Sequence, residues 1–166
     1  GGRWVCELEN KWCETFNVKH AIACNSATSG LLAAARAVGL GPGDQFAVPA
    51  FTMSATAAAP SLLGAAPQFG DVESETFCWG YSQAFRFPKT KALIVTNLFG
   101  HPAQLSYMRM QCDAESHMRE SPFYMIEDNS QSPFAMEKGV YAGTVGHIGV
   151  FSLNVHKHIQ CGEGGV

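Results

Sequence analysis

The chain has 166 residues, of which 46% are hydrophobic and 15% are charged, and its formal net charge is -3. This balance supports a buried globular core and excludes a disordered chain. The eleven Lys and Arg residues are scattered without a basic run. We therefore expect no nucleic-acid partner and no membrane partner.

The six cysteines are irregularly spaced and form no C-x-x-C pair. This pattern favours free thiols in a reducing compartment over a disulfide framework, and it predicts no zinc site. No secretory signal opens the chain, and apolar stretches such as residues 53–66 are too short and interrupted to span a bilayer. We expect a cytoplasmic protein without a bound metal.

The hydrophobic pattern predicts helices and strands that alternate along the chain. Leu8, Trp12 and Phe16 recur every four residues, which predicts a helix over residues 7–17. Next come a predicted strand at 20–24, a helix capped by Thr28 or Ser29 that runs to Val38, a strand at 46–48, a helix at 53–63 and a strand at 67–69.

The second half of the chain continues the alternation. Residues 73–88 have no clear period and are predicted to form a loop with one helical turn. The elements predicted after this loop are a strand at 92–96, a helix at 103–118, a strand at 123–126, a hairpin at 137–142 around Gly139 and a strand at 147–151. The alternation predicts the α/β class, with a mostly parallel sheet and helices on both faces.

Three polar stretches follow predicted strands, at residues 25–29, 128–131 and 152–157. In parallel sheets, ligands bind beyond the carboxyl ends of the strands. The small residues of the first stretch join a strand to a helix N-terminus, where free N–H groups and the helix dipole can hold a phosphate. A plain N-cap without any ligand explains the same residues.

Asp128 and Lys157 carry the chemistry of the other two stretches. Asp128 follows an apolar strand and could pair with a cationic ring nitrogen, although an N-cap role fits it equally well. Lys157 follows a strand and precedes a glycine-rich turn, with few other charges nearby. A surface position is the default for a lysine, whereas a desolvated lysine becomes a usable amine nucleophile.

Together these stretches resemble the DegT/DnrJ/EryC1/StrS family of sugar aminotransferases, which are fold-type-I enzymes dependent on pyridoxal phosphate (PLP). The resemblance covers nearly the whole chain. It rests on the opening helix and small-residue turn at 7–31, GPGD at 41–44 with VPAFT at 48–52, Phe99-Gly100, IEDNSQ at 126–131, and the Ser152-to-Gly165 run with Lys157 and GEGG. The last two motifs, in this order and spacing, are highly specific.

The resemblance implies a role for each matching residue. Lys157 would hold PLP as a Schiff base and later move the proton between the substrate carbon and the cofactor. Asp128 would pair with the protonated pyridine nitrogen, and Gln131 with the phenolic oxygen of the ring. Phosphate contacts are expected from Ala27, Thr28 and Ser152. Glu163 is expected to have a supporting role only.

The sequence departs from the family pattern at a few positions. Ala27 stands where the family often has Gly, and Met53 occupies the ring-stacking position, for which Phe51 is a substitute. Ser132-Pro133 replaces the usual Ala-His. Lys157 is flanked by His156 and His158, and one branch of the family has a histidine in place of the lysine and acts as a sugar dehydratase.

The implied function is transfer of an amino group, typically from glutamate, to a keto group of a nucleotide-linked sugar, in a homodimer. The family's N-terminal segment and small C-terminal domain are not represented, so residues 1–166 are expected to form a single, partial PLP-binding large domain. A truncated, non-catalytic remnant that binds PLP or pairs with another chain, and a PLP-dependent sugar dehydratase, are the alternatives. A serine hydrolase is disfavoured because no G-x-S-x-G turn is present.

Overall fold

The computed structural model describes residues 2–80 and 85–166, so residues 81–84 of the predicted loop lie outside the described part. The helices are α1 (Arg3–Phe16), α2 (Ala27–Ala37), α3 (Ser54–Ser61) and α5 (Leu105–Met118). The strands are β1 (Gln45–Pro49), β2 (Ala66–Gly70), β3 (Thr90–Thr96), β4 (Tyr124–Asp128), β5 (Met136–Glu137), β6 (Val140–Tyr141) and β7 (Ile148–Val150).

Five strands form one sheet in the order β2-β1-β3-β4-β7, and every neighbouring pair is parallel. The register places Thr96, Asp128 and Val150 side by side, so the carboxyl ends of β3, β4 and β7 meet at one edge. The short strands β5 and β6 form a separate antiparallel hairpin around Gly139. The predicted α/β class, the largely parallel sheet and the hairpin are confirmed.

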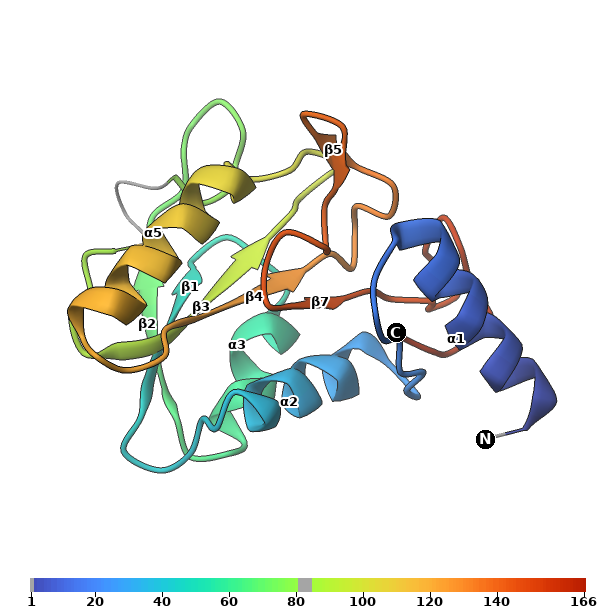
Figure 1. Ribbon diagram of the computed structural model, residues 1–166, viewed down its shortest axis with the longest axis horizontal. Coiled ribbons are helices and arrows are strands. Elements are labelled where there is room, and N and C mark those ends of the chain that lie inside the picture. Colours follow the sequence, from blue (N-terminus) through green and yellow to red (C-terminus); the bar gives the residue numbers. More distant parts are fainter. Residues whose placement is uncertain (1, 81–84) are drawn as a thin grey trace.

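Helices cover both faces of the sheet, with α5 on one side and α2 and α3 on the other (Figure 1). The alternation of side chains along β3 shows why, because successive residues of a strand point to opposite faces. Leu93 and Val95 pack in the cluster that contains α5, whereas Ala92 and Ile94 pack in the cluster that contains α2 and α3. Each face therefore has its own hydrophobic core.

Helix α1 lies beyond the β7 edge and packs on the segment that follows β7 (Figure 1). Trp12 and Phe16 are buried against Phe151, with ring centroids 5.1 Å from it in both cases. Leu8 packs against the same cluster, so the predicted helical face is confirmed. This third cluster holds the chain after β7 in place.

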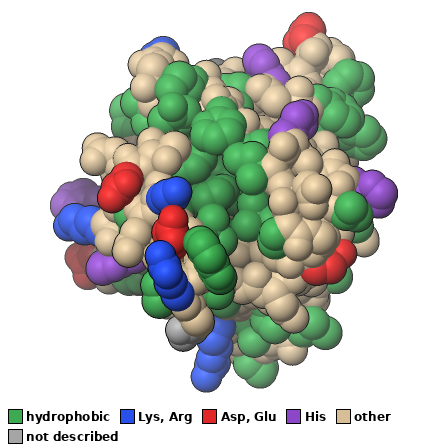
Figure 2. All heavy atoms as spheres, turned by 90° about the vertical axis from the view of Figure 1, so that its right-hand side faces the viewer, with side chains coloured by type: hydrophobic (Ala, Val, Ile, Leu, Met, Phe, Trp, Pro, Cys, Tyr) green, Lys and Arg blue, Asp and Glu red, His purple; other side chains and the backbone are tan. Residues whose placement is uncertain are grey.

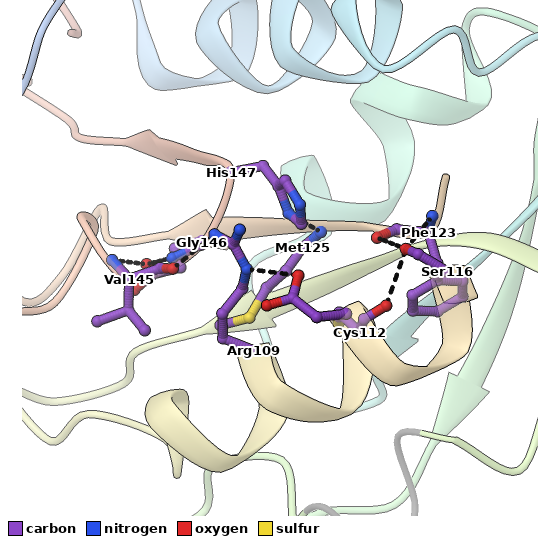
Figure 3. Close-up of polar contacts among 10 residues, drawn as sticks. Arg109, Cys112, Ser116, Phe123, Met125, Val145, Gly146 and His147 are labelled. Atoms are coloured by element: carbon purple, nitrogen blue, oxygen red, sulfur yellow. Dashed lines mark hydrogen bonds and ion pairs between the residues drawn. The ribbon is translucent and has the colours of Figure 1, made fainter. Parts of the chain in front are cut away.

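Polar contacts tie α5 to the β4–β7 edge (Figure 3). The Arg109 guanidinium donates to the carbonyl of Val145 at 3.1 Å, and the Ser116 hydroxyl accepts from the backbone just before β4. The backbone N–H of Met125 donates to Nδ1 of the His147 ring at 2.9 Å, and the backbone N–H of His147 donates to the Met125 carbonyl at 2.8 Å. The bonds between Met125 and His147 join the two segments directly before the first paired residues of β4 and β7.

Two predicted details are wrong. Residues 20–24 do not form a strand: Cys24 makes a single antiparallel bridge to Gly165, and the N–H of Ala23 donates to a Glu9 carboxylate oxygen instead of a neighbouring strand. The N-cap of α2 is Ser26 rather than Thr28 or Ser29, because the Ser26 hydroxyl accepts from the Ser29 N–H. The other predicted helices and strands are present with shifted ends.

All six cysteines are free thiols. Burial raises the pKa of the Cys112 thiol to about 12, with the nearby Asp113 carboxylate adding to the rise. Within residues 2–80 and 85–166, no helix combines the length and the apolar composition that crossing a bilayer requires.

Candidate active site

A cavity of about 420 Å³ opens at the carboxyl end of the parallel sheet. Its walls come from the N-terminus of α2, the turn before α3, the ends of β3 and β4, and the loop after β7. Apart from the substitute Phe51, the residues predicted for the site line this one cavity: Ala27, Thr28, Met53, Asp128, Gln131, Ser152 and Lys157. The fold thus brings together three stretches that are far apart in the sequence.

The N-terminus of α2 forms one end of the cavity. Ser26 caps the helix, since its hydroxyl accepts from the Ser29 N–H at 3.2 Å. In the described part of the chain, the N–H groups of Ala27 and Thr28 have no hydrogen-bond acceptor. Free N–H groups at the positive end of a helix dipole form a site for an anion such as a phosphate.

Gly165 of the glycine-rich turn packs directly on this helix end. A Cβ atom at Gly165 would lie 2.7 Å from the carbonyl carbon of Ser26 and 2.8 Å from the nitrogen of Ala27. Two backbone hydrogen bonds to Cys24, at 2.8 and 2.9 Å, hold Gly165 there. Only glycine allows this approach, so the turn after Lys157 also sets the position of the anion site.

Asp128 projects into the cavity from the end of β4, and its side chain is largely buried. Its Oδ2 accepts from the Thr56 hydroxyl at 2.7 Å, and its Oδ1 accepts from the Ser130 hydroxyl at 2.5 Å and the Ser130 N–H at 3.2 Å. The Thr56 hydroxyl is 2.9 Å from that of Thr52, which is 3.0 Å from that of Thr96. A row of hydroxyl groups thus holds the carboxylate in one orientation.

Lys157 lies half-buried at the tip of the loop between β7 and the glycine-rich turn. Its backbone N–H donates to the carbonyl of Asn154 at 2.9 Å. Across the neck of the loop, the Val155 N–H donates to Gly162 at 2.7 Å. The loop is therefore closed by its own backbone, and Lys157 lines the same cavity as Asp128.

Glu127 precedes Asp128 and points to the opposite face of the sheet. It is fully buried and accepts hydrogen bonds from the N–H groups of Gly143, Val145 and Gly146 and from the Asn97 amide. Burial raises the pKa of this carboxyl group, while the hydrogen bonds act in the opposite direction. Glu127 is a structural anchor for the turn that precedes β7.

The predicted ring-stacking residue Met53 lies at the mouth of the cavity with 66% of its surface exposed. Phe51, the predicted substitute, is not among the described residues that line the cavity. Its ring packs instead near Phe77 and Phe99, with centroid distances of 5.6 and 6.4 Å. The structure therefore brings Met53, rather than Phe51, to the other site residues.

Several polar residues of the site were given no individual role from the sequence. Thr52, Thr96, Ser130 and Asn154 line the cavity. Thr56 contacts the Asp128 carboxylate from α3. Ser130 and Asn154 lie within the polar stretches at 128–131 and 152–157, and Thr52 ends the VPAFT motif. Thr96 also carried a signal, because it is the polar residue that ends a buried strand in a parallel sheet.

Of the two histidines beside Lys157, His156 lines the cavity and His158 does not. Both are exposed. In residues 2–80 and 85–166, no group of three His, Cys, Asp or Glu side chains is arranged to hold a metal ion.

A larger hollow of about 800 Å³ lies between α1, α2 and β7, away from the predicted site residues. Figure 2 shows this side of the molecule, where hydrophobic side chains form a band down the centre. No Asp or Glu is present among the described residues of its lining, which include Trp12, Phe16, Ile22 and Val150. The hollow lacks the mixture of amine, carboxylate and free N–H groups that the smaller cavity has.

The chemical groups of the smaller cavity fit PLP. The free N–H groups of α2, with the hydroxyl groups of Thr28 and Ser152, suit its phosphate. The carboxylate of Asp128 suits a protonated ring nitrogen, and the amine of Lys157 suits its aldehyde. A parallel α/β sheet with these groups at its carboxyl edge defines the class of fold-type-I, PLP-binding proteins.

The model of the DegT/DnrJ/EryC1/StrS aminotransferase family matches residues 1–166, and the chain belongs to this family. A curated relative, GDP-perosamine synthase from Caulobacter vibrioides, is 34% identical over 170 residues. The match covers 99% of this chain and 43% of that relative. The chain thus spans less than half the length of this relative.

Solved structures agree with the family assignment. The aminotransferase from Psychrobacter cryohalolentis is 30% identical, with a TM-score of 0.89 over 99% of this chain and 41% of that chain. The E. coli GDP-4-keto-6-deoxy-D-mannose-3-dehydratase, solved with bound hydrated PLP, is 27% identical, with a TM-score of 0.86 over 99% of this chain and 43% of that chain. The resemblance predicted from the motifs is confirmed.

Proposed function

We propose that this chain forms the cofactor-binding part of a PLP-dependent sugar aminotransferase. The substrate would be a nucleotide-linked keto sugar, and the amino donor would be an amino acid such as glutamate. The observation that carries the proposal is that Lys157, Asp128 and the N-terminus of α2 line one cavity of about 420 Å³. Family membership and the names of the relatives support the same reaction class.

When bound, PLP supplies an electron sink that stabilises negative charge at the substrate carbon. Lys157 would hold the cofactor covalently through Nζ and, once displaced by the amino donor, would move the proton at that carbon. Asp128 would hold the proton on the ring nitrogen, and hydrogen bonds from Thr56 and Ser130 fix the position of its carboxylate. Ala27, Thr28 and Ser152 would bind the phosphate, and Gln131 the phenolic oxygen.

The open mouth of the cavity supports the idea of a homodimer, with a second copy covering the site. Met53 is two-thirds exposed there, and Phe51, Phe77 and Phe99 form a group of exposed aromatic side chains. Exposed apolar side chains of this kind mark a surface that a partner covers, and such a cover would exclude water from the cofactor. The six free thiols support a cytoplasmic location, where cysteines stay reduced.

A PLP-dependent sugar dehydratase is the second candidate. The E. coli dehydratase is 27% identical to this chain, and His156 lines the cavity beside Lys157. The two candidates differ in whether Lys157 forms the covalent bond to the cofactor. A third outcome is a chain that binds PLP without turnover.

A half-reaction with glutamate separates these functions. The purified protein is loaded with PLP and mixed with glutamate, and the keto acid product and the absorbance of the cofactor are followed. Conversion in the wild type and its loss in Asp128→Asn would support the aminotransferase. Cofactor bound to Lys157 without any conversion would favour the non-catalytic chain. Cofactor held without a bond to Lys157 would favour the dehydratase.

A further inference from the structure

We infer that Asn154 and Glu163 form a positioning pair that orients the Lys157 loop for covalent capture of the cofactor. The inference rests on the proposed function, because it assumes that Lys157 is the residue that binds PLP. Neither side chain is assigned a contact with the reacting atoms. Their effect is exerted through the loop that carries the amine.

Asn154 is bonded on three sides within the loop. Its Nδ2 donates to Oε1 of Glu163 at 2.5 Å, and its Oδ1 accepts from the backbone N–H of His156 at 3.1 Å. Its backbone carbonyl accepts from the N–H of Lys157 at 2.9 Å. Asn154 therefore bonds to the backbone of both His156 and Lys157, and it also contacts the opposite limb of the loop.

The Asn154–Glu163 bond crosses from the limb after β7 to the limb formed by the glycine-rich turn. In the part of the chain that the structure describes, it is the only bond between two side chains that joins these limbs. The other cross-links use backbone atoms or the Cys161 thiol, such as the bond from Val155 N–H to Gly162. Changes at the Asn154–Glu163 pair therefore leave the backbone bonds of the neck intact.

Both side chains line the same cavity as Lys157. Because the hydrogen bond of the pair is exposed, it replaces bonds to water and contributes little to folding stability. Its contribution to reactivity can be larger, since small errors in the placement of a reacting group slow a reaction strongly. Capture joins Nζ of Lys157 to the aldehyde carbon of PLP and releases one water molecule, so it consumes no oxidant or reductant.

Three variants test the pair through the direction of its hydrogen bond. N154D removes the donor and places two carboxylates in contact, whereas E163Q retains an oxygen that accepts from Asn154. The double variant N154D/E163Q restores the bond in the reversed direction, with the new amide as donor. Q160A is the matched control, because Gln160 accepts from the Gly162 N–H in the same loop but is not among the cavity-lining residues.

Covalent capture of PLP is followed by stopped-flow absorbance, and borohydride trapping with peptide mass spectrometry identifies the linked lysine. We expect N154D to capture PLP about tenfold more slowly, while E163Q, Q160A and the double variant stay near the wild-type rate. The affinity for pyridoxamine phosphate, which has no aldehyde and forms no bond to the lysine, should not weaken in N154D. A general structural defect would weaken both the capture of PLP and the binding of pyridoxamine phosphate.

Capture by N154D at the wild-type rate, or a double variant as slow as N154D, would overturn the inference. Equal weakening of PLP capture and pyridoxamine phosphate binding would also overturn it, because the pair would then be structural only. A wild-type protein that forms no bond at Lys157 would instead overturn the proposed function itself. The wild-type measurement therefore distinguishes the two failures.

Discussion

Oγ1 of Thr56 donates a hydrogen bond to Oδ2 of Asp128 at 2.7 Å, although the two residues are 72 positions apart in the sequence. Because Thr56 uses its single hydroxyl proton in this bond, it must be the acceptor in its contact with Thr52. Thr52 therefore donates to Thr56 and accepts from Thr96. The row of hydroxyl groups therefore has one direction, and it ends on the carboxylate proposed to bind the ring nitrogen.

Thr56→Val should weaken PLP binding by about tenfold and lower the free energy of unfolding by about 1–2 kcal/mol, because a buried hydrogen bond to a charged group is lost. The matched control is Thr90→Val, since Thr90 is also buried and donates to the carbonyl of Phe87 at 2.7 Å. Both variants should lose stability in urea titrations. Only Thr56→Val should lose cofactor affinity, and equal affinities would contradict the assigned role of Thr56.

Gly165→Ala should damage the anion site. The new Cβ would meet the backbone of Ser26 and Ala27 at 2.7–2.8 Å, and backbone atoms cannot rotate out of the way. We expect a loss of about 1–3 kcal/mol in unfolding free energy, together with weaker binding of PLP. Gly41→Ala is the control, because a Cβ there meets nothing within 4 Å. Unchanged PLP affinity in Gly165→Ala would show that the glycine turn does not set the anion site.

Much of the fold could be predicted from the sequence because its signals are local. The four-residue spacing of Leu8, Trp12 and Phe16 defines the buried face of α1. The apolar runs of β3 and β4 are typical of strands covered on both faces. The strand predicted at 20–24 failed because an apolar run does not reveal its partners. Among the described residues, its backbone forms a bridge with Gly165 alone.

The candidate site was predicted through short motifs, and the structure places those residues around one cavity. The supporting residues could not be found in the same way. Thr56 lies within an alanine-rich helix and contacts Asp128 only because α3 packs at the end of β4. Asn154 contacts Glu163 only because the loop turns back on itself. Both contacts depend on tertiary structure rather than on residue spacing.

The lowered pKa of His147 predicts that the folded protein loses stability at acid pH. Burial, with the nearby Arg109 charge adding to it, lowers the pKa of this imidazole below its ordinary value, and the neutral Nδ1 accepts from the Met125 N–H. A group whose pKa is lowered by folding binds more protons when unfolded. Its neutral form therefore stabilises the fold above the unfolded pKa, and this contribution is lost as the pH falls toward the folded pKa.

The matched variant is His147→Asn, in which Oδ1 can replace Nδ1 as the acceptor but cannot be protonated. Urea titrations at about pH 7.5 and about pH 5.5 should show that the wild type loses more stability than the variant over this range. Other titrating groups cancel when the two proteins are compared at each pH. Equal losses would show that His147 does not contribute to the pH dependence.

The most direct measurement is the identity of the residue that becomes linked to PLP. The wild-type protein is incubated with PLP, reduced with borohydride, digested, and analysed by mass spectrometry beside Lys157→Ala and the surface control Lys138→Ala. We predict that the reduced cofactor is found on the peptide that contains Lys157, that Lys138→Ala labels equally, and that Lys157→Ala does not label there or elsewhere in stoichiometric amount. Stoichiometric labelling at another lysine, with Lys157 unmodified, would contradict the account.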